Sequence, residues 1–153
     1  PDFELIVSNG TAFSLDGRTM YFSDTLGDQV WCFDLDPDEG SLSNPRPFFS
    51  TADRPGMIDG GTVDSEGCYW CAVVAGGKVL RLDPKGRVML EIDMPVPRPT
   101  CPTFGGPDHD RLFITSQRLF MSDAELEKYP QSGNIFVIDG LGVRGVPEER
   151  FAG

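Results

Sequence analysis

Three oxygen-bearing residues, Asn9, Asp59 and Thr100, stand at the start of three similar segments of this sequence. Amide, carboxylate and hydroxyl oxygens are the donors that hard divalent cations such as Ca²⁺, Mg²⁺ and Mn²⁺ take in proteins. If the fold brings these positions together, their chemistry is that of a cation site. Asn-Gly and Asp-Gly are also common turn dipeptides, so the same residues could serve only to bend the chain.

Other catalytic arrangements find little support in the sequence. It has no Gly-x-Ser-x-Gly motif, and its single histidine, His109, cannot build a histidine-rich zinc site. Cys68 and Cys71 are three residues apart on an expected strand, where they face opposite sides of the sheet. These two cysteines are therefore expected to pack in a core.

The elements that must position these residues are mostly strands. Short aromatic and β-branched runs bounded by Gly, Pro, Asp or Asn are typical of strands. A helix is expected over residues 122–129, where Ser122 and Glu125 form a capping-box pattern and Pro130 follows. The class is all-β, with strands expected at residues 19–23, 29–35, 69–74, 78–82, 88–92, 111–115 and 134–138.

An internal repeat organises the strands. The segments that begin with Asn9, Asp59 and Thr100 are called the head segments. Each is followed by a turn, then by an aromatic strand, and then by a strand that ends in an acid, at Asp34, Asp83 and Asp139. Repeats of about 40–50 residues with four strands each are typical of β-propeller blades. We expect three blades, at roughly 1–50, 51–98 and 99–153, which is fewer than the four to eight of a closed ring.

The geometry of a propeller blade predicts where the head segments lie. The first strand of a propeller blade lines the central channel, so the three head residues would converge there. The acids after the third strands are expected to cap turns. Trp31 and Trp70 recur within the repeats and are expected to pack between blades.

Composition limits the partners. The 153 residues carry a formal net charge of −11 without a run of Lys or Arg, which argues against nucleic acid. No apolar stretch approaches the 18 or so residues of a membrane span. Four cysteines are too few for a disulfide scaffold, and the first residues lack a signal-peptide pattern, so a cytoplasmic location is expected.

Residues 8–21 and 58–67 together resemble the SMP-30/gluconolactonase/regucalcin-like family. The similarity continues in order along the chain. Ile58 stands where that family usually has proline, which changes the turn and keeps the acid after it. The other matching segments are residues 76–84, 101–106, 133–136, 140–145 and 151–153.

The resemblance implies the C-terminal half of a six-bladed propeller. It also implies that Asn9 and Asp59 are ligands of a divalent cation (Ca, Zn, Mg or Mn) and that Asp59 is the general base. The expected activity is metal-dependent hydrolysis of a sugar-derived lactone. The chain is expected to be inactive without the N-terminal half. The remaining blades would come from the same longer chain or from a partner chain.

Two alternatives stay open. The chain could belong to a calcium-binding regulatory protein without useful turnover, as the regucalcin name suggests. It could also be a non-catalytic half-propeller that acts as an interaction module.

Overall fold

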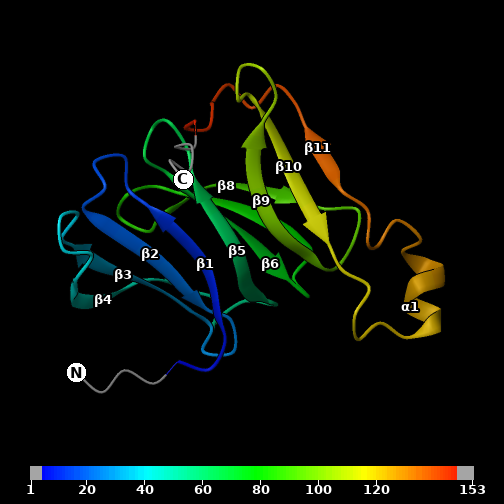
Figure 1. Cartoon of the computed structure of the whole chain (residues 1–153). Coiled ribbons are helices and arrows are strands. Elements are labelled where there is room, and N and C mark those ends of the chain that lie inside the picture. The colour runs from blue at the N-terminus through cyan, green and yellow to red at the C-terminus, as the bar shows by residue number, and fades with distance from the viewer. Residues whose placement is uncertain (1–4, 148–153) are drawn as a thin grey trace.

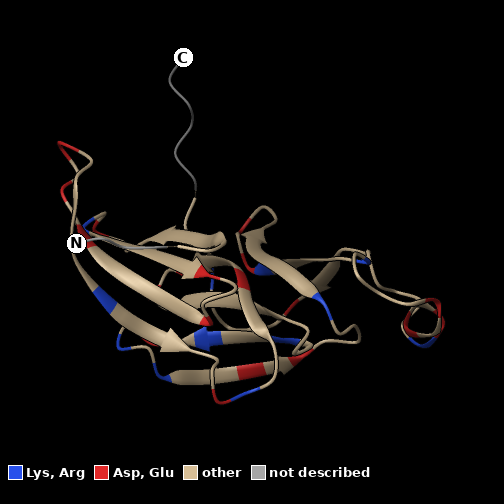
Figure 2. Ribbon diagram, turned by 90° about the horizontal axis from the view of Figure 1, so that it is seen from below, with Lys and Arg blue, Asp and Glu red and all other residues tan. Residues whose placement is uncertain are grey.

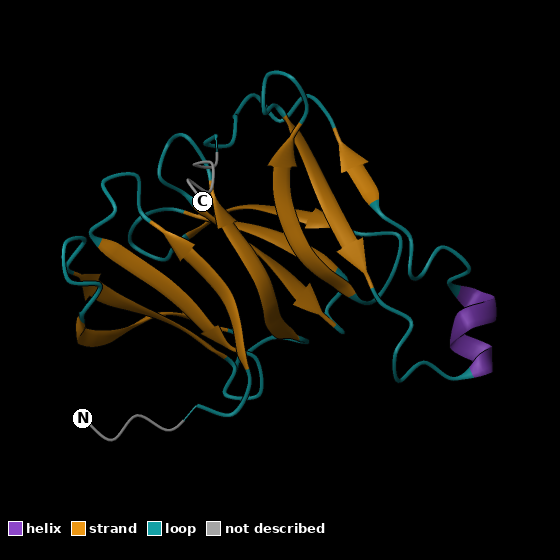
Figure 3. Ribbon diagram, viewed as in Figure 1, coloured by secondary structure: helices purple, strands orange, loops and turns teal. Residues whose placement is uncertain are grey.

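The computed structural model describes residues 5–147, and strands dominate it (Figure 3). They form three antiparallel sheets, and the chain runs through them in turn (Figure 1). The last matching segment of the sequence, residues 151–153, lies outside the described residues. The first sheet has the order β1-β2-β3-β4, with bounds Ser8–Phe13, Thr19–Asp24, Gln29–Leu35 and Leu42–Ser50.

The second sheet repeats this meander and the third shortens it. Both keep sequence order from the inside outwards, as β5-β6-β7-β8 and β9-β10-β11. The third sheet has three strands within residues 5–147, where the repeat predicted four. The bounds are Met57–Val63, Tyr69–Val74, Lys78–Leu82 and Val88–Asp93 in the second sheet, and Pro99–Gly105, Arg111–Ser116 and Phe136–Ile138 in the third.

Adjacent sheets pack face to face, with one core cluster at each junction. Between the first and second sheets, Tyr21 of β2 meets Tyr69 of β6 at a ring-centroid distance of 5.2 Å. Between the second and third, Trp70 meets Phe104 of β9 edge-on at 5.6 Å. The expected role of Trp70 between blades is confirmed. These stacked sheets form a partial β-propeller, with β1, β5 and β9 as neighbouring inner strands (Figure 1).

A buried acid ties the second sheet together. Asp64 is fully buried after β5 and accepts hydrogen bonds from Trp70 Nε1 and Arg81 Nε, both at 2.8 Å. The backbone N–H groups of Glu66 and Cys68 donate to the same carboxylate. A buried carboxylate with four donors fixes the turn before β6 and the indole that packs against the third sheet.

The helix α1 (Asp123–Lys128) confirms the capping prediction. Ser122 is its N-cap, and both capping-box hydrogen bonds with Glu125 are present. It has no buried residue and projects beside the third sheet, beyond β11, in the two views of Figures 1 and 2. Within residues 5–147 no helix is long and apolar enough to cross a bilayer.

Candidate metal site

The three sequence-predicted head residues lie at equivalent irregularities of the inner strands. Asn9 pairs with Ser23 and Ala12 pairs with Tyr21, so β1 advances by three residues where β2 advances by two. A bulge therefore begins at Asn9. Asp59 lies inside the matching register shift of β5, and Thr100 inside that between β9 and β10. Bulges re-aim side chains at the rims of sheets. Here each irregularity includes or begins at one of the three head residues, and the first also contains Thr11.

The first two bulges touch one another. Ser23 Oγ of β2 donates to the Asp59 carbonyl at 2.8 Å, and the Tyr69 hydroxyl donates to the Gly10 carbonyl at 2.7 Å. Gly10 has φ of +52°, and a Cβ there would lie 2.8 Å from the Asp59 carbonyl oxygen. The absent side chain at Gly10 lets β1 and β5 approach, so Asn9 and Asp59 lie on neighbouring inner strands.

Asn9 is half-buried, and its amide group is held on one side. Its Nδ2 donates to Thr25 Oγ1 at 2.9 Å. No described residue donates a hydrogen bond to its Oδ1. With the amino group engaged, Oδ1 is the atom of this side chain left to bind a ligand.

Asp59 is a partly buried carboxylate without a protein partner. Within residues 5–147 it accepts no side-chain hydrogen bond and forms no ion pair, and burial raises its pKa. Burial also raises the pKa of the nearby Cys101 thiol, and the Asp59 charge adds to that rise. A desolvated carboxylate without a donor costs free energy that a cation would offset.

Thr100 differs from the other two. Its hydroxyl is 2.7 Å from Thr115 Oγ1 of β10, so it is engaged within its own sheet. In the described part of the chain, no three His, Cys, Asp or Glu side chains gather into a metal cluster. The oxygen donors of Asn9 and Asp59 fit a hard cation such as Ca²⁺, Mg²⁺ or Mn²⁺ better than Zn²⁺, which favours His and Cys.

The acids after the third strands serve local structure. Asp83 accepts from the N–H groups of Lys85 and Arg87, which confirms its expected turn-capping role. Asp34 instead pairs with Arg46 at 2.8 Å, and Asp139 with Arg111 at 3.1 Å.

The two neighbouring cysteines are structural. Cys68 and Cys71 are buried free thiols, and burial raises the pKa of Cys71 to about 12. A thiol with so high a pKa is a poor thiolate ligand.

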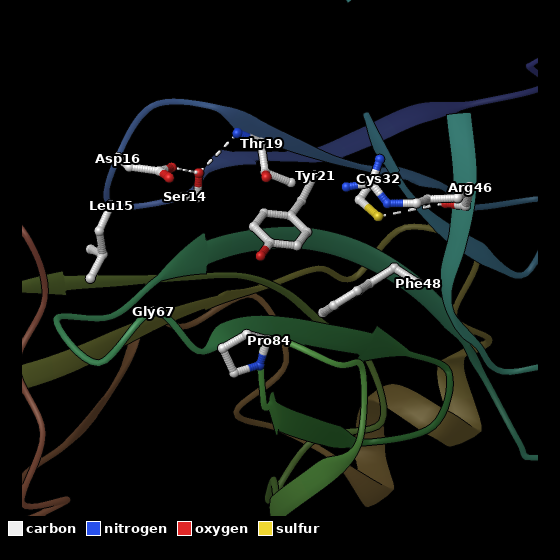
Figure 4. Close-up of a pocket in the computed structure, with 10 residues that line it drawn as sticks. All are labelled: Ser14, Leu15, Asp16, Thr19, Tyr21, Cys32, Arg46, Phe48, Gly67 and Pro84. Carbon is white, nitrogen blue, oxygen red and sulfur yellow. Dashed lines mark hydrogen bonds between the residues drawn. The ribbon is translucent and has the colours of Figure 1, made fainter. Parts of the chain in front are cut away.

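A pocket of about 420 Å³ lies between the first two sheets, at the opposite end of β1 from Asn9 (Figure 4). Its polar groups bond to one another: Ser14 Oγ donates to Asp16 at 2.6 Å and accepts from the Thr19 N–H at 2.9 Å. Neither Asn9 nor Asp59 lines it. The unpartnered carboxylate, rather than the size of this pocket, marks the candidate site.

Sequence reasoning missed the residues that hold the site in place. Ser23 and Thr25 sit at the end of a strand that otherwise reads as aromatic and apolar. The polar run Ser23-Asp24-Thr25 was the available signal. The bulges themselves depend on pairing between strands, which one sequence does not display.

Comparison with known proteins supplies the family. Residues 2–118 match the model of the SMP-30/Gluconolactonase/LRE-like region. The chain belongs to this family. Regucalcin from Xenopus laevis is 37% identical over 153 residues, which are 99% of this chain and 51% of that relative.

Solved structures of the family share the fold. A regucalcin from Agrobacterium tumefaciens, described as a calcium-binding protein, superposes with a TM-score of 0.87 at 34% identity, over 93% of this chain and 48% of its own. A gluconolactonase from Xanthomonas campestris gives 0.62 at 33% identity, over 74% of this chain and 36% of its own. The chain therefore spans about half the length of the curated relatives it matches.

Proposed function

We propose that this chain supplies one side of the channel of a metal-dependent lactonase. Asn9 Oδ1 and the Asp59 carboxylate would be cation ligands, and the substrate would be a sugar-derived lactone. The observation that carries the proposal is the partly buried, unpartnered carboxylate of Asp59, on the inner strand next to that of Asn9, whose amino group is already held. Membership of a family that includes a described gluconolactonase supports the substrate class.

The chain's own residues would share the work of hydrolysis. A bound divalent cation supplies positive charge that stabilises the developing oxyanion. Asp59 takes a proton from the water that attacks the lactone carbonyl carbon. It returns this proton to the ring oxygen as the ring C–O bond breaks, which gives the hydroxy acid. Asn9 takes no part in proton transfer in this scheme. Its Oδ1 would hold the cation in position.

Two ligands do not complete a hard-cation site. Ca²⁺ takes six to eight oxygens and Mg²⁺ takes six, some of them from water. The remaining donors would come from the other blades, either in the same longer chain or from a partner chain. Full activity would then require the closed ring.

Replacement of Asp59 in the complete ring tests the proposal. Asp59→Ala should lower metal-dependent hydrolysis of glucono-δ-lactone, followed by pH-stat titration, by about 100-fold or more, the lower end for a lost general base. Asp83→Ala is the matched control, because its carboxylate caps a turn, and should retain activity once folded. Full activity of the Asp59 variant would refute the site.

A calcium-binding protein without turnover is the second candidate, favoured by the relatives named regucalcin. It would use the same two ligands. Saturable cation binding without lactone hydrolysis in the complete ring would favour it. An interaction module would show neither activity nor cation binding.

A further inference from the structure

Three polar residues lie buried in succession around the end of β2. Ser23, Asp24 and Thr25 expose 0%, 5% and 8% of their surfaces. Buried polar side chains are normally hydrogen-bonded, so each needs a partner that justifies its burial.

All three bond to the segments that carry the candidate ligands. Asp24 accepts from the N–H groups of Ile6 and Val7, at 3.2 and 2.9 Å, and the Thr25 N–H donates to the Val7 carbonyl at 3.0 Å. These bonds anchor the chain that leads into β1. Thr25 Oγ1 then accepts from Asn9 Nδ2, and Ser23 Oγ donates to the Asp59 carbonyl.

We propose that Thr25 and Ser23 are positioning residues of the site, an inference that rests on the proposed function. An asparagine presents its oxygen to a cation only if its amino group finds an acceptor elsewhere. Thr25 Oγ1 is that acceptor, 2.9 Å away in a buried position. Without it, turning Oδ1 to the cation would leave a desolvated N–H₂ without a partner.

Ser23 acts on the second ligand through the backbone. Its hydroxyl fixes the carbonyl of Asp59 itself, inside the bulge that aims the carboxylate. Gly10 leaves room for this bond, because a Cβ there would collide with Ser23 Oγ. One strand end thus positions ligands from two sheets.

Mn²⁺ binding measures this role. Free Mn²⁺ gives an electron paramagnetic resonance signal that is lost on binding, so its dissociation constant can be measured for the complete ring, which supplies the remaining ligands. We expect Thr25→Val to weaken Mn²⁺ binding about tenfold, as for other residues that orient metal ligands, and Thr25→Ser to bind like the wild type. Thr103→Val, an exposed threonine of β9, is the matched control and should change nothing.

A double-mutant cycle separates positioning from stability. Aspartate has no amino group to satisfy, so Thr25→Val should have little effect on Mn²⁺ binding in an Asn9→Asp background. A tenfold loss that persists there, or Thr25→Val binding as tightly as the wild type, would overturn the inference. If the complete ring with the wild-type sequence binds no Mn²⁺ at all, the proposed function itself fails. Melting temperatures of all variants show which are folded, and Ser23→Ala repeats the test at the second ligand.

Discussion

At the scale of the residue, the buried acids of this chain differ in whether the protein supplies them with hydrogen-bond donors. Asp59 has burial without a protein partner, whereas Asp64 has burial with four donors. Sequence reasoning named Asp59 and did not single out Asp64, because both stand in one head segment and only the fold shows which carboxylate is satisfied.

Removing the Asp64 carboxylate should destabilise the chain strongly. Asp64→Ala leaves Arg81 and the Trp70 indole without their shared acceptor, and breaking a buried ion pair costs about 3–5 kcal/mol. Urea unfolding followed by circular dichroism measures the change. Glu66→Ala is the control, because this exposed partner of Arg81 should matter by less than about 1 kcal/mol. Equal effects of the two variants would contradict the assignment.

Acid should remove the contribution of Asp83. The Arg87 N–H, and next the Arg87 side chain, hold the pKa of this carboxyl below its usual value. A carboxyl whose pKa is lowered by folding stabilises the folded state at pH values above its unfolded pKa of 3.8. This contribution to stability is lost as the pH falls through the pKa of the folded state. Asp83→Asn should therefore be less stable than the wild type at pH 7, with a gap that narrows below pH 4 in urea titrations. A gap independent of pH would show that the charge is not involved.

At the scale of the element, the inner-strand bulges depend on glycine. Gly10→Ala should cost more than the roughly 1–2 kcal/mol of left-handed backbone strain, because its Cβ would also collide with Ser23, Asp59 and Tyr69. Gly17→Ala isolates the strain alone, since Gly17 has φ of +66° and open space around it. Thermal unfolding of both variants compares them, and a Gly10 variant no less stable than the Gly17 variant would contradict the close approach of β1 and β5.

Strands could be predicted from the sequence where a local residue pattern defines their ends. The strands β3, β6 and β7 have the expected bounds, since alternation and turn residues define them. β4 was missed because Pro45 and Pro47 interrupt its pattern, yet an edge strand tolerates proline. Asn9 and Asp59 could be named as ligands from repeat and resemblance, and their role remains a prediction. The Ser23 and Thr25 contacts cross between strands and sheets, so no local pattern contained them.

At the scale of the whole molecule, the two terminal sheets each have a face turned away from the second sheet. On the first, Phe13 of β1 pairs with Met20 and is 50% exposed. On the third, Val137 of β11 pairs with Phe113 and is 47% exposed. Apolar sheet faces of this kind favour association.

The 153-residue chain by itself should therefore self-associate and show little lactonase activity, even with excess metal. Light scattering coupled to gel filtration measures its mass. The variant Phe13→Asp/Val137→Asp should shift the mass towards that of a monomer, whereas Leu119→Asp, at an exposed position in the loop between β10 and α1, should not. A monodisperse wild-type monomer with the turnover of a complete ring would contradict this expectation.

The junction of the second and third sheets contains its own optical reporter. Trp70 is fully buried, its indole N–H is bound by Asp64 and its ring lies against Phe104. Trp31→Phe would leave it as the single tryptophan of the chain. Its fluorescence should then be emitted at short wavelength while the two sheets stay packed, and move to longer wavelength when water reaches the ring. The separation of neighbouring blades could thus be followed in real time without attaching a dye.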